Sequence, residues 1–186
     1  MPWSFVLWFI LGILLFWSVG AYNRMVRLRS ATLEAFATLD AQLMRLVDLL
    51  QSSLPAAVAP SAVAQPGVVP GDVASLWDGL QSAASQFTAS LAAARAHPLD
   101  GDAMAALSAA QGVLAMAWQR LQHEAHDLAG AAVPETLQVQ WEQLALPARV
   151  AGEHFNLAVA RYNEAIAQFP ALLLARLFGF KVARPV

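Results

Sequence analysis

The chain has 186 residues, of which 11 are basic and 13 acidic, and a formal net charge of −2. A charge balance this close to neutral gives neither the basic field that favours nucleic acid nor the acidic run of a disordered tail. The absence of cysteine excludes disulfides, thiol catalysis and cysteine-ligated zinc. Alanine, the strongest helix former, is abundant, so the composition predicts an all-α protein without a nucleic-acid partner.

The N-terminal segment from residue 2 to residue 21 contains no charged side chain. Twenty helical residues extend about 30 Å, the thickness of a bilayer's hydrocarbon core, so the segment predicts a transmembrane helix in a lipid bilayer. A cleaved signal peptide is the alternative, because small residues occur at 19–21, but no Lys or Arg precedes the long apolar run. Arg24, Arg27 and Arg29 follow the segment directly, and retained positive charge predicts that the rest of the chain is cytoplasmic.

No Gly or Pro occurs between Ala21 and Leu54, so the helix is expected to continue unbroken beyond the membrane. Apolar side chains then recur at spacings of three and four, which predicts one buried face of a bundle helix. The positions of this face are Leu33, Phe36, Leu39, Leu43, Leu46, Leu50 and Leu54. Four prolines and no charged residue between 55 and 71 predict an extended crossover to the next helix.

Two further amphipathic segments follow the crossover. Asp72 is expected to cap a second helix that ends before His97-Pro98. Its apolar face consists of Val73, Trp77, Leu80, Ala84, Phe87, Leu91 and Ala94. A third helix is expected to begin at Asp102 and to end at Gly130. Its buried face consists of Met104, Leu107, Gln111, Leu114, Trp118, Leu121, Ala125 and Leu128.

A fourth helix is expected to begin at Pro134, because proline suits the first helical turn, and to be kinked by the interior Pro147. Its apolar face consists of Leu137, Trp141, Leu144, Ala148, Ala151, Phe155, Val159, Tyr162 and Ile166. Trp77, Trp118 and Trp141 all lie on such faces and are expected to fill the core. The pattern predicts an anchor over residues 1–22 that continues into an antiparallel four-helix bundle over residues 23–170.

The C-terminal segment, residues 171–186, is mostly apolar and too short to span a bilayer. It either covers one end of the bundle or lies in the membrane interface with Arg176 and Lys181 toward the headgroups. The fourth helix of an up-down bundle that starts at the membrane ends near the membrane again, so both arrangements remain open.

Two segments of the chain resemble the LemA family of bacterial membrane proteins. The first covers residues 22–49 and matches at Tyr22, Asn23, Leu28, Arg29, Glu34, Ala35 and a D-x-QL-x-R-x-x-DL pattern that contains Asp40, Arg45 and Asp48. The second covers residues 162–181 and matches at Tyr162, Asn163, Phe169, Pro170, Gly179 and Phe180. Differences from the family pattern at Leu46, residues 49–54 and Gly152 indicate a divergent member.

The resemblance implies a helical single-pass protein of the bacterial inner membrane that has no established enzymatic activity. Relatives are suspected of signalling, antigen or membrane-organising roles. The matching polar and aromatic positions are therefore candidate interaction or structural residues. Asp and Arg on long helices, however, more often bridge neighbouring helices or face solvent.

The sequence HEAHD at residues 123–127 is the main candidate for metal chemistry. His123 and His126 are three residues apart, whereas the zinc-protease helix needs four, and no Glu precedes a His by three residues as di-iron bundles require. A solvated helix edge is therefore favoured over a metal-binding bundle. No nucleophile elbow or triad pattern occurs, so we expect no catalytic residue, no cofactor and no metal.

These features favour a membrane-anchored scaffold or interaction module without catalysis, which associates with itself or with another membrane protein. The alternative is a membrane-shaping protein in which the anchor and the C-terminal tail both engage lipid.

Overall fold

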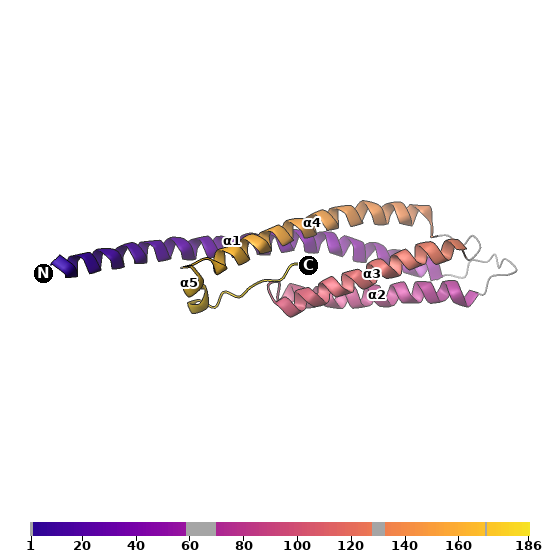
Figure 1. The fold of residues 1–186 in the computed structure, drawn as a ribbon. Helices are drawn as coiled ribbons and strands as arrows, with labels where there is room; N and C mark the ends of the chain where they lie inside the picture. Colours follow the sequence, from indigo (N-terminus) through magenta and orange to yellow (C-terminus); the bar gives the residue numbers. More distant parts are fainter. Residues whose placement is uncertain (1, 59–69, 128–132, 170) are drawn as a thin grey trace.

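The computed structural model describes residues 2–58, 70–127, 133–169 and 171–186. Its helices are α1 (Pro2–Val58), α2 (Pro70–Ala96), α3 (Gly101–Asp127), α4 (Glu135–Ala167) and α5 (Ala171–Leu177). Figure 1 shows the four long helices lying roughly along one axis, and the described residues contain no strand. The predicted all-α class is therefore confirmed.

Helix α1 continues without a break from Pro2 into the bundle, as the absence of Gly and Pro between Ala21 and Leu54 predicted. Its N-terminal part extends beyond the other helices, and its large apolar side chains from Trp3 to Val19 are exposed (Figure 1). Within the described residues, α1 is the one helix that is long and apolar enough to cross a membrane. By length and composition, this helix could serve as the predicted anchor.

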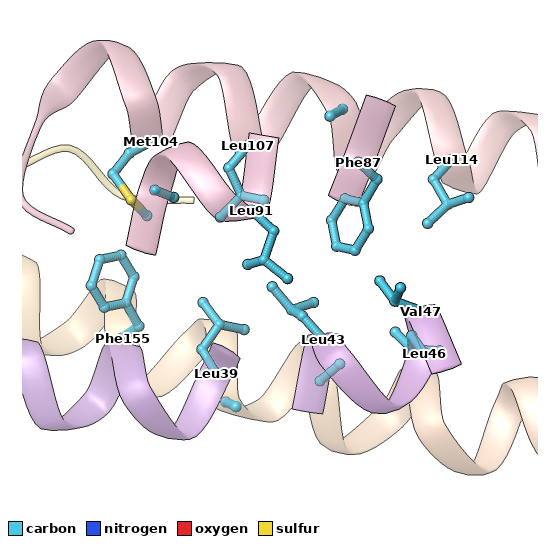
Figure 2. Close-up of a cluster of buried hydrophobic side chains, with 14 of the residues drawn as sticks. Leu39, Leu43, Leu46, Val47, Phe87, Leu91, Met104, Leu107, Leu114 and Phe155 are labelled. Atoms are coloured by element: carbon cyan, nitrogen blue, oxygen red, sulfur yellow. The ribbon is translucent and has the colours of Figure 1, made fainter. Parts of the chain in front are cut away.

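The long helices pack as two antiparallel pairs, α1 with α4 and α2 with α3, and α1 also contacts α2. Figure 2 shows how the pairs face each other: Leu39 and Leu43 of α1 point toward Phe87 and Leu91 of α2 and their neighbours on α3. Each large apolar side chain that becomes fully buried contributes roughly 1.5–3 kcal/mol to folding. The predicted antiparallel bundle is therefore confirmed as the fold.

The predicted apolar faces form most of this core, with one clear exception on α1. Leu33 is 38% exposed, whereas its neighbour Thr32 is fully buried between α1 and α4. The hydroxyl of Thr32 donates to the carbonyl oxygen of Leu28, 2.9 Å away in the same helix, so its polar atom is satisfied in the core. The side chains of Leu54, Val73, Ala125 and Leu128 lie outside the described residues.

The three tryptophans predicted to fill the core, Trp77, Trp118 and Trp141, lie at contacts between helices. Trp77 and Trp118 are buried, and the half-buried ring of Trp141 stacks on Trp118 with ring centroids 4.4 Å apart. This stacking joins α3 to α4, and therefore links the two helix pairs.

Two boundaries differ from the prediction at the crossover. Helix α1 continues past Pro55 to Val58, and α2 already begins at Pro70, so the predicted extended segment over residues 55–71 is too long. Proline lacks an N–H donor, which costs little in the first turn of α2, and α1 ends within three residues of Pro55. Asp72 consequently lies inside α2 and is not its cap. Residues 59–69 of the crossover lie outside the described residues.

Helix α3 begins at Gly101 because Asp100 supplies its cap. A carboxylate oxygen of Asp100 accepts the N–H groups of Asp102 and Ala103 at 3.0 and 2.9 Å. The bond from Ala103 is the largest cause that lowers the pKa of Asp100. The predicted end at Gly130 lies outside the described residues. Helix α4 begins at Glu135, just after Pro134, and continues through Pro147.

Candidate functional site

The chain after α4 turns back onto the bundle through α5. Ala171 and Ala175 of α5 are buried, and α5 packs against both α1 and α4. Gly179 adopts a φ of 71°, a conformation that glycine takes without steric cost. The N–H of Phe180 bonds to the carbonyl oxygen of Ala175 at 2.9 Å, the helix-ending bond of a Schellman turn. Residues 180–186 then run back along the bundle without helix, and we call them the C-terminal strap (Figure 1).

Two asparagines of α4 hold the C-terminal strap through paired hydrogen bonds. Asn163 donates from Nδ2 to the carbonyl oxygen of Ala183 at 2.8 Å and accepts the N–H of Ala183 at 2.9 Å. Asn156 makes the same pair of bonds with Val186, at 3.1 and 2.9 Å. The two asparagines are seven residues apart, which places them on one face of the helix. Each carboxamide thus satisfies the N–H and C=O of one strap residue.

Tyr162 adds a third attachment between α4 and the C-terminal strap. Its side chain is only 1% exposed, and its hydroxyl donates to the carbonyl oxygen of Lys181 at 2.9 Å. Burial raises the pKa of Tyr162, and the nearby charge of Arg29 acts in the opposite direction. Because the net shift is upward, the phenol stays protonated at neutral pH and remains a hydrogen-bond donor.

The ring of Tyr22 on α1 contacts the aromatic rings at the start of the C-terminal strap. Its ring lies 4.9 Å from that of Phe178 and 6.1 Å from that of Phe180, measured between ring centroids. Tyr22 is the residue that follows the charge-free segment of α1, so α5 and the turn lie at the end of the bundle nearest the candidate anchor. The predicted motif positions that converge here are Tyr22, Tyr162, Asn163, Gly179 and Phe180.

Of the remaining predicted positions, Arg29 lies beside this site, whereas Asp40 and Arg45 make contacts elsewhere on α1. Asp40 accepts from Nε of Arg95 on α2 at 2.7 Å, a partly exposed ion pair that contributes little to stability. Arg45 contacts Gln42 of its own helix at 3.4 Å. Arg29 is exposed and lines a cleft that Tyr162 also borders. The side chains of Asn23, Asp48 and Phe169 are exposed, and Pro170 lies outside the described residues.

Asn156 is a site residue that the sequence analysis missed. Its only signal is the spacing of seven residues from Asn163, which puts two amides on one helical face. That spacing alone does not reveal a chain segment returning to meet them. The site therefore extends one hydrogen-bonded pair beyond the recognised motif.

The HEAHD segment has the contacts of a solvated helix edge. Nδ1 of the exposed His123 lies 2.8 Å from the carbonyl oxygen of Gln119, and Glu124 accepts from Arg120 at 2.8 Å. The side chains of His126 and Asp127 lie outside the described residues. Among the residues that are described, no three metal-capable side chains form a group, and no buried side-chain nitrogen or oxygen lacks a hydrogen-bond partner.

A long apolar N-terminal helix continues into an antiparallel bundle, and α5 and the C-terminal strap pack at the end of the bundle nearest to it. These features define a helical-bundle protein whose first helix could span a membrane. The chain belongs to the LemA family, whose family model matches residues 74–185. This range contains the motif segment 162–181 and most of the strap, whereas the motif segment 22–49 precedes it. No curated protein and no solved structure gave a significant match.

Proposed function

We propose that the protein is a membrane-anchored scaffold that associates with further copies of itself and performs no catalysis. Helix α1 serves as the anchor in this proposal, and Arg24, Arg27 and Arg29 favour a bundle on the cytoplasmic side. The observation that supports self-association is a second apolar stripe on α4, which faces away from the bundle. We call it the outer stripe of α4.

The outer stripe of α4 consists of Val139, Leu146, Val150 and Leu157, which are 46%, 55%, 42% and 54% exposed. Their spacings of seven, four and seven residues place them within an arc of about 40° on a helix with 3.6 residues per turn. The core face of α4 lies elsewhere on the same helix, with Ala148, Ala151 and Phe155 buried. A surface helix normally has one apolar face, so a second face indicates an interaction surface.

A parallel pair of copies accounts for the charges beside the outer stripe. Copies anchored in one membrane point the same way, so a two-fold axis along the bundle places each stripe residue opposite its counterpart. Glu153 and Glu164 border the stripe on one side, and His154 and Arg161 border it on the other. The two-fold axis brings Glu164 of each copy within about one helical turn of Arg161 of the other. Confinement to one membrane raises the effective concentration, so a small interface suffices.

Disulfide formation tests this arrangement directly, because the chain has no cysteine of its own. In native membranes, oxidation of the Leu157→Cys variant should give a disulfide-linked dimer on a non-reducing gel, since position 157 faces itself in a parallel pair. Ser85→Cys is the control, because Ser85 is exposed on α2. It should remain monomeric under the same oxidant.

Two outcomes would contradict the parallel pair. A dimer that forms only when Val139→Cys and Leu157→Cys chains are mixed would mean antiparallel copies, and no dimer at any stripe position would exclude self-association through α4.

The Ser85→Cys chain also reports on which side of the membrane the bundle lies. Its thiol should react with a membrane-impermeant maleimide only after lysis, and labelling in intact cells would contradict a cytoplasmic bundle.

Lipid engagement is a second candidate function, favoured by the outer face of α5. Leu173, Leu177 and Phe178 are 59%, 76% and 55% exposed. Ala171 and Ala175 make the contacts to the bundle instead. Leu173 and Leu177 therefore face outward, and the half-exposed ring of Phe178 lies against Tyr22. A bilayer surface lies beside these side chains if α1 spans the membrane.

Replacing Leu173, Leu177 and Phe178 with Ser should separate lipid contact from bundle stability. Because these side chains are exposed, we expect little change in the thermal midpoint of the bundle. Binding of the chain without residues 1–21 to phospholipid vesicles, measured by sedimentation, should weaken by about tenfold or more. Unchanged vesicle binding would argue against the lipid role, and a large fall in the midpoint would show that the three side chains dock on the bundle.

A further inference from the structure

A crevice of about 480 Å³ lies between α1 and the corner where α4 leads into α5. It is formed where the helix that could span the membrane meets the end of the bundle. Its apolar lining includes Ile13, Phe16, Trp17 and Gly20 on one side and Phe169 and Ala171 on the other. The exposed ring of Phe169 therefore stands beside residues of the apolar segment of α1.

The crevice carries its charge at one end. Nη1 of Arg24 donates to Oε1 of Gln168 at 3.5 Å, the upper limit of a hydrogen bond, so most donors of the guanidinium remain available. No acidic residue is among those that line the crevice. Arg24 also forms no ion pair with any acidic group in the described part of the chain.

The length of the crevice along α1 matches one leaflet of a bilayer. Ile13 precedes Arg24 by eleven residues, which is about 16 Å along a helix and close to the thickness of one hydrocarbon leaflet. We infer that the crevice binds one phospholipid of the surrounding bilayer, with an acyl chain along its apolar lining and the phosphate on Arg24. The inference rests on α1 being the anchor and is independent of the outer stripe of α4.

A phospholipid is the occupant that the chemistry favours. Water finds few polar partners along the apolar lining, whereas an acyl chain fills such a surface without losing hydrogen bonds. The crevice is also continuous with the lipid-facing surface of α1, so a bilayer lipid reaches it without crossing protein. The planar guanidinium binds phosphate through two parallel N–H bonds, and an anionic headgroup adds net attraction.

Two glycines of α1 provide a matched pair of variants. A Cβ atom added at Gly20 meets no heavy atom within 4 Å, so a larger side chain there would occupy the crevice without displacing the protein. A Cβ atom at Gly12 also meets nothing, but Gly12 does not line the crevice. Gly20→Leu should therefore block the crevice, and Gly12→Leu adds the same bulk elsewhere on the helix.

Native mass spectrometry of the full chain released from nanodiscs of phosphatidylcholine and phosphatidylglycerol tests the inference. Wild type and Gly12→Leu should each retain one phospholipid per chain, whereas retention by Gly20→Leu should fall about tenfold. Arg24→Gln should bind phosphatidylglycerol about tenfold more weakly and lose the preference for it over phosphatidylcholine. Arg27→Gln removes an equal charge outside the crevice. It should keep the affinity for phosphatidylglycerol and the preference for it over phosphatidylcholine.

Absence of lipid on wild type, or equal retention by the two glycine variants, would overturn the inference. An unchanged lipid preference in Arg24→Gln would overturn the assignment of the phosphate to that residue. Thermal unfolding should show that all variants fold like wild type, since the substituted positions lie outside the core. Gly20→Leu combined with Leu157→Cys should still form the disulfide dimer, which keeps lipid binding and self-association distinguishable.

Discussion

Leu43→Asp is expected to destabilise the bundle by several kcal/mol. Leu43 is fully buried, and Figure 2 shows its side chain pointing into the core toward Leu91. A carboxylate at this position loses its hydration among the buried apolar side chains of the core. A loss of this size is a large fraction of the total stability of a domain, so the midpoint of thermal unfolding should fall by about 10 °C or more. Far-UV circular dichroism of the full chain in detergent measures it.

Leu33→Asp is the matched control for this prediction. Leu33 lies on the same predicted stripe of α1, but its side chain is 38% exposed, so the new carboxylate keeps much of its hydration. We expect a shift of only a few degrees. If Leu43→Asp and Leu33→Asp unfold alike, the core packing of α1 described above is wrong.

The contrast between Leu33 and Leu43 shows what sequence periodicity can and cannot predict. Spacings of three and four identify one face of α1, because only those positions align on a helix. They do not fix where the face ends, since the width of the buried arc depends on how closely α4 approaches. Thr32 lies at the contact between α1 and α4. Because threonine is polar, a pattern of apolar residues does not include it.

The C-terminal region shows a second limit of prediction from sequence. Whether an apolar side chain is buried there depends on what surrounds the bundle, and the sequence pattern does not contain that information. Apolar side chains are expected inside a water-soluble domain, so docking of residues 171–186 on the bundle was one of the two arrangements that the sequence left open. The structure buries Ala171 and Ala175 instead, because small side chains let α5 lie close to α1 and α4. Large apolar residues are less costly on the outside where a membrane surface is adjacent.

The strap site contains several of the candidate positions named from the sequence, but its geometry could not be predicted. The motif positions Tyr162, Asn163 and Gly179 were recognised, and all three are used to turn or hold the C-terminal strap. An extended segment that pairs with side-chain amides has no helical or strand period, so periodicity does not reveal its partner. Asn156 lies 30 residues from Val186, and only the folded chain brings the two together.

Release of the C-terminal strap is the expected result of replacing both Asn156 and Asn163 with Ala. The double substitution removes all four hydrogen bonds that the side-chain carboxamides make with the backbone of Ala183 and Val186. At about 0.5–1.5 kcal/mol net for each bond, the loss is roughly 2–6 kcal/mol. The loss acts locally, because the core of α1 to α4 does not depend on these bonds, so the strap should open while the bundle remains folded.

Hydrogen–deuterium exchange of the full chain in detergent distinguishes this outcome from general destabilisation. The amides of Ala183 and Val186 should exchange at least about thirtyfold faster in the double variant, whereas the amides of the buried parts of α1 and α4 should keep their protection. Asn23→Ala is the control, because Asn23 is exposed on α1, and it should leave strap exchange unchanged. Protection of Ala183 and Val186 that survives the double substitution would mean that Tyr162 and the aromatic contacts at Tyr22 hold the strap without the amides. Faster exchange along the whole of α4 would instead make the amide pairs part of the bundle's own stability, since the helix would then open together with the strap.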